Sequence, residues 1–330
     1  MSRTSLETDR EERQRLVSDV RRVLNFLASR AAILASVCSK QDACKDAIER
    51  LAHSLGDLSR DLGARPSTPC TALVLCGGGA RGAAEVGLYS ALQELKVPID
   101  LVVGSSVGAI VGGFIASGLD ARKLSDLWAC VSEKWSLRPR RDLLWKGARS
   151  PALLDPSPLA KLLELHLPVK RFEDLATQLA VVATDTYSGK GVVLDRGELL
   201  PALLASSAIP GLFPPVELDG RLLMDGSLSH HLPLDVAIER GASRAIAVRC
   251  TKLRGGPVSG ARDLVSRALQ ILLERQLAMS VELARGKAEL WGLEPCYDEP
   301  VGLLDFKASL PLIECVRREA KKKLATLAKV

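Results

Sequence analysis

The stretch CGGGARG at residues 76–82 and the stretch GSSVG at residues 104–108 decide the fold class of this 330-residue chain. Each follows a short apolar run typical of a buried strand, at residues 71–75 and 101–103. We expect a helix after each loop. Two strand–loop–helix units in series predict a parallel sheet, with both loops at its carboxyl edge, where open α/β folds bind ligands.

The second loop fits G-x-S-x-G, the pattern of a nucleophile elbow. Ser106 is the central residue, so it is the candidate nucleophile rather than Ser105. Gly104 and Gly108 leave room where a side chain would collide with the flanking strand and helix. The expected helix at 107–117 points its N-terminus at the serine, where the helix dipole favours developing negative charge. The alternative is a helix start that merely packs small residues.

The first loop offers backbone N–H groups. Its residues are Gly77, Gly78, Gly79, Ala80, Arg81 and Gly82. Such groups bind a tetrahedral oxyanion or a phosphate equally well, and the charge of Arg81 suits a phosphate-bearing substrate. For Arg81 the alternative is an ion pair with a surface carboxylate. The loop also fits G-x-G-x-x-G, but a dinucleotide site needs an acid near the end of the second strand, and Asp100 stands at its beginning.

A serine nucleophile needs a base. The chain has four histidines, at positions 53, 166, 230 and 231, and the first two lie in helical stretches. His230 and His231 follow the tripeptide Asp225-Gly226-Ser227, which comes after a short apolar run. A carboxylate within about 2.6–3.2 Å of the hydroxyl can itself act as the base. Because Asp-Gly is also a common turn pair, these residues alone leave both interpretations of Asp225 open.

Together these motifs resemble the patatin-like phospholipase family. The resemblance rests on three ordered motifs, at residues 77–82, 104–108 and 225–227, and covers most of the chain, residues 70–310. The run ASSAIPGLFPP at residues 205–215 is similar to the family's sequence ahead of its aspartate. The resemblance implies a three-layer α/β/α sandwich with a mainly parallel central sheet.

The resemblance also implies an activity, the hydrolysis of lipid acyl esters by a Ser–Asp dyad without histidine. It implies Ser106 as nucleophile, Asp225 as base, and the loop at 77–82 as the donor of oxyanion N–H groups, with Arg81 near the phosphate. The implied enzyme is a phospholipase A, lysophospholipase or esterase acting on a lipid or ester substrate. No metal or organic cofactor is implied.

Two departures from the family pattern keep alternatives open. Ser227 stands where the family usually has glycine or alanine, and His230 and His231 stand where relatives commonly carry asparagine and a neutral residue. A conventional triad of Ser106 and a histidine oriented by Asp185 preserves the order serine, acid, histidine. The rival class is a non-catalytic lipid- or protein-binding module that retains the fold.

Four regions are expected along the chain: an N-terminal helical hairpin at 1–64, a stiff linker at 65–70, the catalytic domain at 71–310 and a basic helix at 311–330. Further strands are expected at 179–185, 192–194, 222–224 and 245–248, and helices at 199–206, 232–240, 261–284 and 313–328. Alternating strands and helices favour an α/β sandwich. The apolar window at 101–119 is interpreted as a buried strand and helix rather than a membrane span.

The net charge of +6 is spread unevenly. Residues 133–149 hold six Lys or Arg against two acids, and Trp128, Trp135 and Trp145 lie in or near them. This segment and the basic tail at 317–329 predict peripheral contact with an anionic membrane. The alternatives are an ordinary basic loop with core tryptophans and a solvated helix face. No nucleic-acid motif accompanies the basic patches.

Composition predicts a cytoplasmic protein, and the basic segments predict contact with the inner face of the membrane. The N-terminus lacks the apolar core of a signal peptide. The eight cysteines have no CxxC or metal-ligand spacing, and most fall in apolar segments, as reduced buried thiols do. Nothing in the sequence specifies an oligomeric state.

Overall fold

The described part of the chain consists, in the computed structural model, of Leu27 and residues 70–134, 138–140, 142, 150, 152–250, 260–294, 301–302 and 305–327. The described residues from Cys70 onward belong to one unit, Pro69–Val330. The predicted hairpin at 1–64 and the linker lie, apart from Leu27 and Cys70, outside the described residues. So does most of the basic segment at 133–149, including Trp135 and Trp145.

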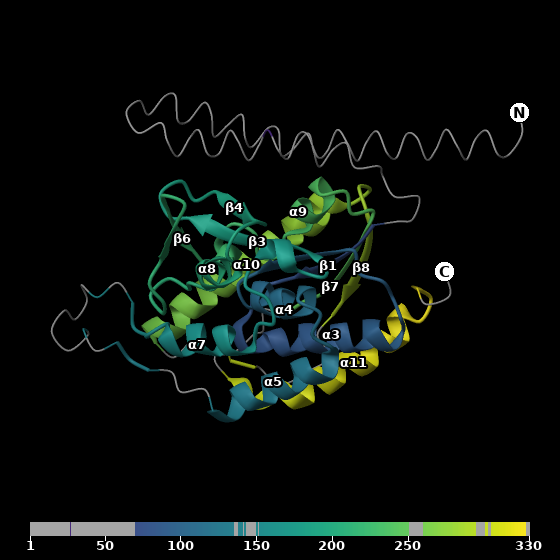
Figure 1. The fold of residues 1–330 in the computed structure, drawn as a ribbon, viewed down its shortest axis with the longest axis horizontal. Helices are drawn as coiled ribbons and strands as arrows, with labels where there is room; N and C mark the ends of the chain where they lie inside the picture. Colours follow the sequence, from purple (N-terminus) through teal and green to yellow (C-terminus); the bar gives the residue numbers. More distant parts are fainter. Residues whose placement is uncertain are drawn as a thin grey trace, which may run out of the picture. The chain divides into compact units, whose positions relative to one another are not determined.

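A mainly parallel sheet forms the centre of the unit (Figure 1). Among the described residues it has eight strands in the order β5-β6-β3-β2-β1-β7-β8, with β4 paired to β3. The bounds are β1 Thr71–Leu75, β2 Leu101–Ser105, β3 Gln178–Asp185, β4 Gly191–Leu194, β5 Val216–Leu218, β6 Arg221–Met224, β7 Arg244–Val248 and β8 Glu289–Leu293. Strands β3, β2, β1, β7 and β8 run parallel, and β4, β5 and β6 are antiparallel additions.

Helices cover both faces of the sheet, which confirms the predicted three-layer sandwich. Their bounds are α3 Ala83–Glu94, α4 Val107–Ala116, α5 Ala121–Lys134, α7 Ser157–His166, α8 Leu199–Ser206, α9 Leu234–Glu239, α10 Ala261–Ala284 and α11 Ser309–Leu324. Figure 1 shows α3, α4, α5 and α11 on one face and α9 and α10 on the other. Short 3₁₀ turns add η1 Gly79–Gly82, η3 Phe172–Asp174, η4 Gly226–Leu228 and η5 Phe306–Ala308.

The register of the central strands brings the two glycine loops together. Leu75 of β1 lies opposite Gly104 of β2 in the parallel pair, so both loops leave the sheet at the same carboxyl edge. Every residue of β1 and β2 is buried, because helices cover both sides of these strands. The expected apolar window at 101–119 is therefore β2 and α4. Among the described residues, no helix combines the length and apolar character needed to cross a membrane.

The basic C-terminal helix packs against the catalytic unit. A Cβ atom at Gly87 of α3 would lie 2.4 Å from the carbonyl oxygen of Ile313, so glycine allows α3 and α11 to approach closely. Arg317 and Lys321 of α11 both pair with Glu94 of α3. Two of the cations expected to face a membrane thus bind a protein carboxylate, and membrane contact through 317–329 stays a prediction.

Most of the described cysteines are thiols, in line with the expectation from composition. Cys70, Cys76, Cys130 and Cys250 are not in disulfides, and Cys76 and Cys250 are buried. Cys315 is disulfide-bonded, which the sequence did not indicate. Strands β5 and β8 were not expected from the sequence, because β5 has only three residues and β8 contains a glycine and a tryptophan without clear alternation.

Candidate active site

Ser106 sits on a strained turn between β2 and α4. Its backbone has φ 56° and ψ −126°, a conformation that L-residues rarely adopt. A Cβ atom at Gly104 would lie 2.4 Å from the carbonyl oxygen of Gly108. One at Gly108 would lie 2.7 Å from the carbonyl oxygen of Leu75 and 2.8 Å from that of Cys76. Both flanking positions therefore require glycine, for the steric reason that the elbow pattern predicts.

Serines from the run at 205–215 hold the elbow in place. The backbone N–H of Ser106 donates to Ser206 Oγ over 2.9 Å, and Ser206 Oγ in turn donates to the carbonyl of Val182 over 2.6 Å. Ser207 Oγ donates to the carbonyl of Ser106 over 3.3 Å. In the sequence this run carries only a likeness to the family, and no role for Ser206 or Ser207 follows from it. The only sequence feature that could have pointed to this role was the pair of small polar residues in the run at 205–215.

Ser106 and Asp225 meet directly. Ser106 Oγ donates to Asp225 Oδ2 over 2.6 Å, although the residues are 119 positions apart. The second carboxylate oxygen accepts from the backbone N–H of Ser227 over 2.8 Å. Asp225 caps the short turn η4, and a Cβ atom at Gly226 would lie 2.0 Å from the carbonyl oxygen of Val182. The Asp-Gly pair therefore does form a turn, and that turn presents the carboxylate to the serine.

The protein interior changes the acidity of this carboxyl group. Asp225 is only 4% exposed, and burial raises its pKa to about 6. Hydrogen bonds from Ser106 and Ser227 act in the opposite direction but are outweighed. A carboxylate with a pKa near 6 is ionised at neutral pH and is a stronger base than an ordinary aspartate.

The glycine loop at 77–82 passes beside these two side chains. A Cβ atom at Gly77 would lie 1.9 Å from Ser227 Oγ and 3.2 Å from Ser106 Cβ, so the loop backbone packs directly against both Ser227 and Ser106. The N–H of Gly77 is already used, since it donates to the carbonyl of His231 over 3.2 Å. The N–H groups of Gly78 and Gly79 donate to no acceptor among the described residues. They are available to an incoming anionic oxygen.

Arg81 lies in η1, within the same loop. Its Nε donates to the carbonyl of Val301 over 3.0 Å, which fixes the position of the guanidinium. The predicted alternative, an ion pair with a surface carboxylate, is not among the ion pairs of the described residues. The remaining guanidinium nitrogens can therefore still bind an anion.

An apolar cavity of about 60 Å³ opens beside the serine. Ser106, Gly79 and Ser207 contribute its polar edge. Its apolar lining comes from Val107, Ile110, Phe114, Leu127, Trp128, Leu159, Leu162, Ile209, Phe213 and Phe306. A lining of this composition favours an apolar group over a charged one. Trp128 is buried here with its ring centroid 6.5 Å from that of Phe306, so it belongs to the core rather than to a membrane-facing surface.

The proposed histidine triad is not assembled. Ser106 Oγ bonds to Asp225, and the Asp185 carboxylate accepts from the backbone N–H groups of Tyr187 and Ser188 and from Ser188 Oγ. His230 Nε2 lies 3.1 Å from Asp235 Oδ2. Both acids that could assist a histidine base are thus engaged away from the serine.

The two histidines have structural contacts that explain their place next to the site. His231 is fully buried, and burial is the main reason why its pKa is lowered to about 4, so the ring is neutral at pH 7. Its backbone binds Gly77 through the carbonyl and Gln276 through the N–H. The carbonyl of His230 accepts from Ser105 Oγ over 2.6 Å. Ser105 is therefore a structural serine that anchors this segment.

The histidines expected in helical stretches lie away from the dyad or outside the described residues. His166 is the last residue of α7, and His53 lies outside the described residues.

The sequence model of a family described as patatin-like phospholipase matches residues 73–238, half of the chain. The matched range includes the glycine loop, the elbow and Asp225, and it ends within α9.

Similar proteins come from bacteria and animals. An uncharacterized NTE family protein of Mycobacterium tuberculosis is 36% identical over 203 residues, which are 61% of this chain and 54% of that protein. Patatin-like phospholipase domain-containing protein 6 of Homo sapiens is 35% identical over 182 residues, 54% of this chain and 13% of that protein. The chain thus spans about half the length of the mycobacterial relatives.

Among solved structures, VipD from Legionella pneumophila matches with a TM-score of 0.43 and 14% identity, over 78% of this chain and 67% of that one. The type III effector ExoU matches with a TM-score of 0.38 and 19% identity, over 79% of this chain and 53% of that one.

Proposed function

Because the chain belongs to the patatin-like phospholipase family, we propose that it is a serine lipid acyl hydrolase that uses a Ser106–Asp225 dyad. The observation that carries the proposal is the 2.6 Å hydrogen bond from Ser106 Oγ to Asp225 Oδ2 at the mouth of an apolar cavity. A nucleophile, a base and a site for a hydrocarbon chain are the three elements that ester hydrolysis of a lipid requires.

In the first half of the reaction Ser106 Oγ attacks the carbonyl carbon of the ester while Asp225 takes its proton. The N–H groups of Gly78 and Gly79, from the loop at 77–82, bind the oxyanion of the tetrahedral intermediate. The N-terminus of α4 adds a favourable dipole at the serine. When the intermediate collapses, the C–O bond breaks and Asp225 returns the proton to the departing alkoxide.

In the second half water replaces the alcohol. Asp225 takes a proton from the water, which attacks the acyl carbon of the acyl-enzyme. The second intermediate collapses with release of the carboxylic acid, and Ser106 Oγ recovers a proton from Asp225. The same base and the same oxyanion donors serve both halves, so no further titratable side chain is needed.

The substrate class follows from the lining of the cavity and the adjacent charge. Apolar side chains receive the acyl chain, and Arg81 lies in the loop beside the serine, where a lipid phosphate can bind it. We therefore favour a phospholipid or lysophospholipid ester, in an activity of the phospholipase A or lysophospholipase type. We further propose that the protein is cytoplasmic and meets lipid at the inner membrane face through residues 133–149, whose basic and aromatic composition supports this.

A fluorophosphonate probe tests the dyad. Such a probe phosphonylates a serine only where a base activates it and an oxyanion site receives the product. We expect stoichiometric labelling of the wild-type chain at Ser106, no labelling of Ser106→Ala, and strongly slowed labelling of Asp225→Asn. Ser90→Ala is the matched control, because Ser90 is a buried serine of α3 that donates to the Val86 carbonyl of its own helix and should not affect the label.

The rival class gives the opposite results. A non-catalytic binding module would bind phospholipid vesicles without labelling or turnover. An absence of labelling in the wild type, or equal labelling of Ser106→Ala, would sink the hydrolase proposal.

A further inference from the structure

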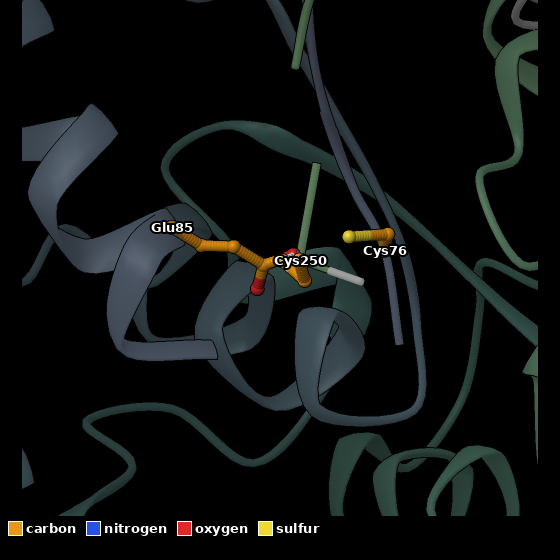
Figure 2. A group of neighbouring side chains, drawn as sticks. All are labelled: Cys76, Glu85 and Cys250. Atoms are coloured by element: carbon orange, nitrogen blue, oxygen red, sulfur yellow. Dashed lines mark hydrogen bonds between the residues drawn. The ribbon is translucent and has the colours of Figure 1, made fainter. Parts of the chain in front are cut away.

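Three potential metal ligands meet behind the glycine loop, outside the dyad. Cys76 follows β1, Glu85 lies in the first turn of α3, and Cys250 follows β7. One donor atom from each lies within 4.8 Å of the others, and all three residues are fully buried. Figure 2 shows the carboxyl group of Glu85 and the sulfur of Cys76 both directed toward Cys250.

The distances around this cluster fit a tetrahedral metal site. With Zn–S bonds of about 2.3 Å and Zn–O bonds of about 2.0–2.2 Å, tetrahedral sulfur–oxygen edges measure about 3.5 Å. Cys250 Sγ lies 3.5 Å from Glu85 Oε1. The carbonyl oxygen of Val248 lies 3.4 Å from Cys76 Sγ and 3.7 Å from Cys250 Sγ. Val248 therefore supplies a fourth donor at the same spacing.

Glu85 is the part of the cluster that the protein itself leaves unsatisfied. Its side chain is 0% exposed, and Oε2 has no hydrogen-bond partner among the described residues. A buried carboxyl oxygen without a partner costs free energy, so such oxygens are usually hydrogen-bonded or coordinated to a metal. No Lys or Arg pairs with Glu85 among the ion pairs of the described residues.

We propose that Cys76, Glu85, Cys250 and the Val248 carbonyl bind one structural zinc ion. Two thiolates and a carboxylate bring three negative charges, and a divalent cation reduces the net charge of the site to one. The N-terminal turn of α3, which carries Glu85, favours that remaining negative charge. Thiolate donors select zinc over magnesium or calcium, which prefer oxygen ligands in larger number.

The site would brace the proposed oxyanion loop. Cys76 directly precedes Gly77, and a Cβ atom at Gly78 would lie 3.1 Å from Cys250 Cβ. A metal bound there ties the ends of β1 and β7 to the start of α3, and so fixes both sides of the loop backbone. The four donors close the coordination sphere, as in structural rather than catalytic zinc sites. The role is therefore to position the loop, without contact to substrate.

Sequence spacing does not reveal this site. Short motifs such as CxxC identify ligands that are neighbours along the chain. Here the two cysteines stand at positions 76 and 250, and only the parallel β1–β7 pair brings their strand ends together.

The test measures bound metal in the full-length chain. The protein is produced in zinc-supplemented medium, purified with a non-chelating reductant, and analysed by mass spectrometry for metal content. We expect about one zinc per chain, lost to a strong chelator together with roughly 5–10 °C of melting temperature. Zinc, but not magnesium, should restore the melting temperature. The active-site variant Ser106→Ala should hold the same amount of zinc, so this result does not depend on hydrolase activity.

Ligand variants locate the ion. Cys250→Ser and Glu85→Gln should reduce zinc to background, whereas Cys130→Ser, a half-buried thiol in α5, should leave it unchanged. Glu85→Gln keeps the shape of the side chain, so it tests the site even where a cysteine variant does not fold. Three results would overturn the proposal: wild type without zinc, ligand variants that retain it, or a Cys76–Cys250 disulfide in the protein purified under reductant.

Discussion

Asp225 and Glu85 are the two buried acidic side chains among the described residues, and they differ in their neighbours. Burial raises the pKa of Asp225 to about 6 and raises that of Glu85 well above its usual range. Both oxygens of Asp225 accept hydrogen bonds, from Ser106 Oγ and the Ser227 backbone. Glu85 has a thiol 3.5 Å from one oxygen and no partner for the other.

The comparison separates two uses of a buried carboxyl group. Asp225 faces a hydroxyl at a cavity, and two donors keep its charged form accessible near neutral pH, as a general base requires. Glu85 faces two thiols behind the loop. There its charged form would be stabilised by a bound cation, and among the described residues it hydrogen-bonds to no hydroxyl from which to take a proton. Burial alone is common to both, so it does not identify a catalytic acid. The hydrogen-bond partners do.

Asp225→Asn and Glu85→Gln are a matched pair of variants that tests most directly whether the two carboxyl groups have different roles, since each replaces a buried carboxyl by an amide of the same shape. We expect Asp225→Asn to lower kcat on a soluble ester by about 10²–10⁴-fold, the usual contribution of a general base. Glu85→Gln should have a smaller effect, because the proposed role of Glu85 is to position the loop at 77–82 through a metal ion rather than to take a proton. Steady-state kinetics at saturating ester measures both, and equal losses would remove the distinction.

The free energy of unfolding of the wild type, relative to that of Asp225→Asn, should depend on pH through the Asp225 carboxyl group. Its folded pKa of about 6 lies above its usual value of 3.8, so between these pH values the folded state binds more protons than the unfolded state. Stability associated with Asp225 is therefore present below about pH 4 and is lost as pH rises through 6. The loss approaches about 3 kcal/mol at neutral pH.

The measurement is urea unfolding of wild type and Asp225→Asn at several pH values. The free energy of unfolding of the wild type should fall relative to that of the variant as pH rises from about 4 to 7. If the free energies of unfolding of the two proteins changed in parallel with pH, burial would not raise the pKa of Asp225.

The fold was largely predictable because its decisive features are local. Short apolar runs, each followed by a glycine loop, identified β1, β2 and the elbow. Steric contacts at Gly104 and Gly108 explain why the elbow pattern is specific. Helix α10 has the predicted bounds, since it follows a glycine and keeps a continuous helical pattern. β8 escaped prediction because its pairing with β7, rather than its own sequence, determines it.

The site was only partly predictable, since its remaining parts depend on contacts between distant residues. Asp225 could be assigned as a base only through the family resemblance, because Asp-Gly reads equally well as a turn. Ser206 supports the elbow from 100 positions away, and a serine in an apolar helix has no sequence signature for that role. The juxtaposition of Cys76 with Cys250 likewise follows from strand order.

The pH dependence of turnover sharpens the assignment of Asp225 as the base. The free enzyme needs the ionised carboxylate, so kcat/KM should fall as pH drops through the Asp225 pKa of about 6. It should be about tenfold lower near pH 5 than at its neutral plateau. A pH–rate profile on a soluble ester checks this. An acidic limb near pH 4 would assign an ordinary, unshifted carboxylate instead.

His230→Ala should have the smallest effect on turnover and tests whether Asp225 acts without a histidine. Because His230 Nε2 contacts Asp235 and Ser106 contacts Asp225, kcat/KM should change by no more than about threefold. The variant should instead affect stability. The hydrogen bond to Asp235 raises the pKa of His230, so the stabilisation is present below its usual pKa of 6.5 and is lost as pH rises through the folded value. The melting temperature of His230→Ala should therefore differ from that of the wild type more at acidic than at alkaline pH. A loss of turnover as large as that of Asp225→Asn would instead make His230 part of the catalytic machinery.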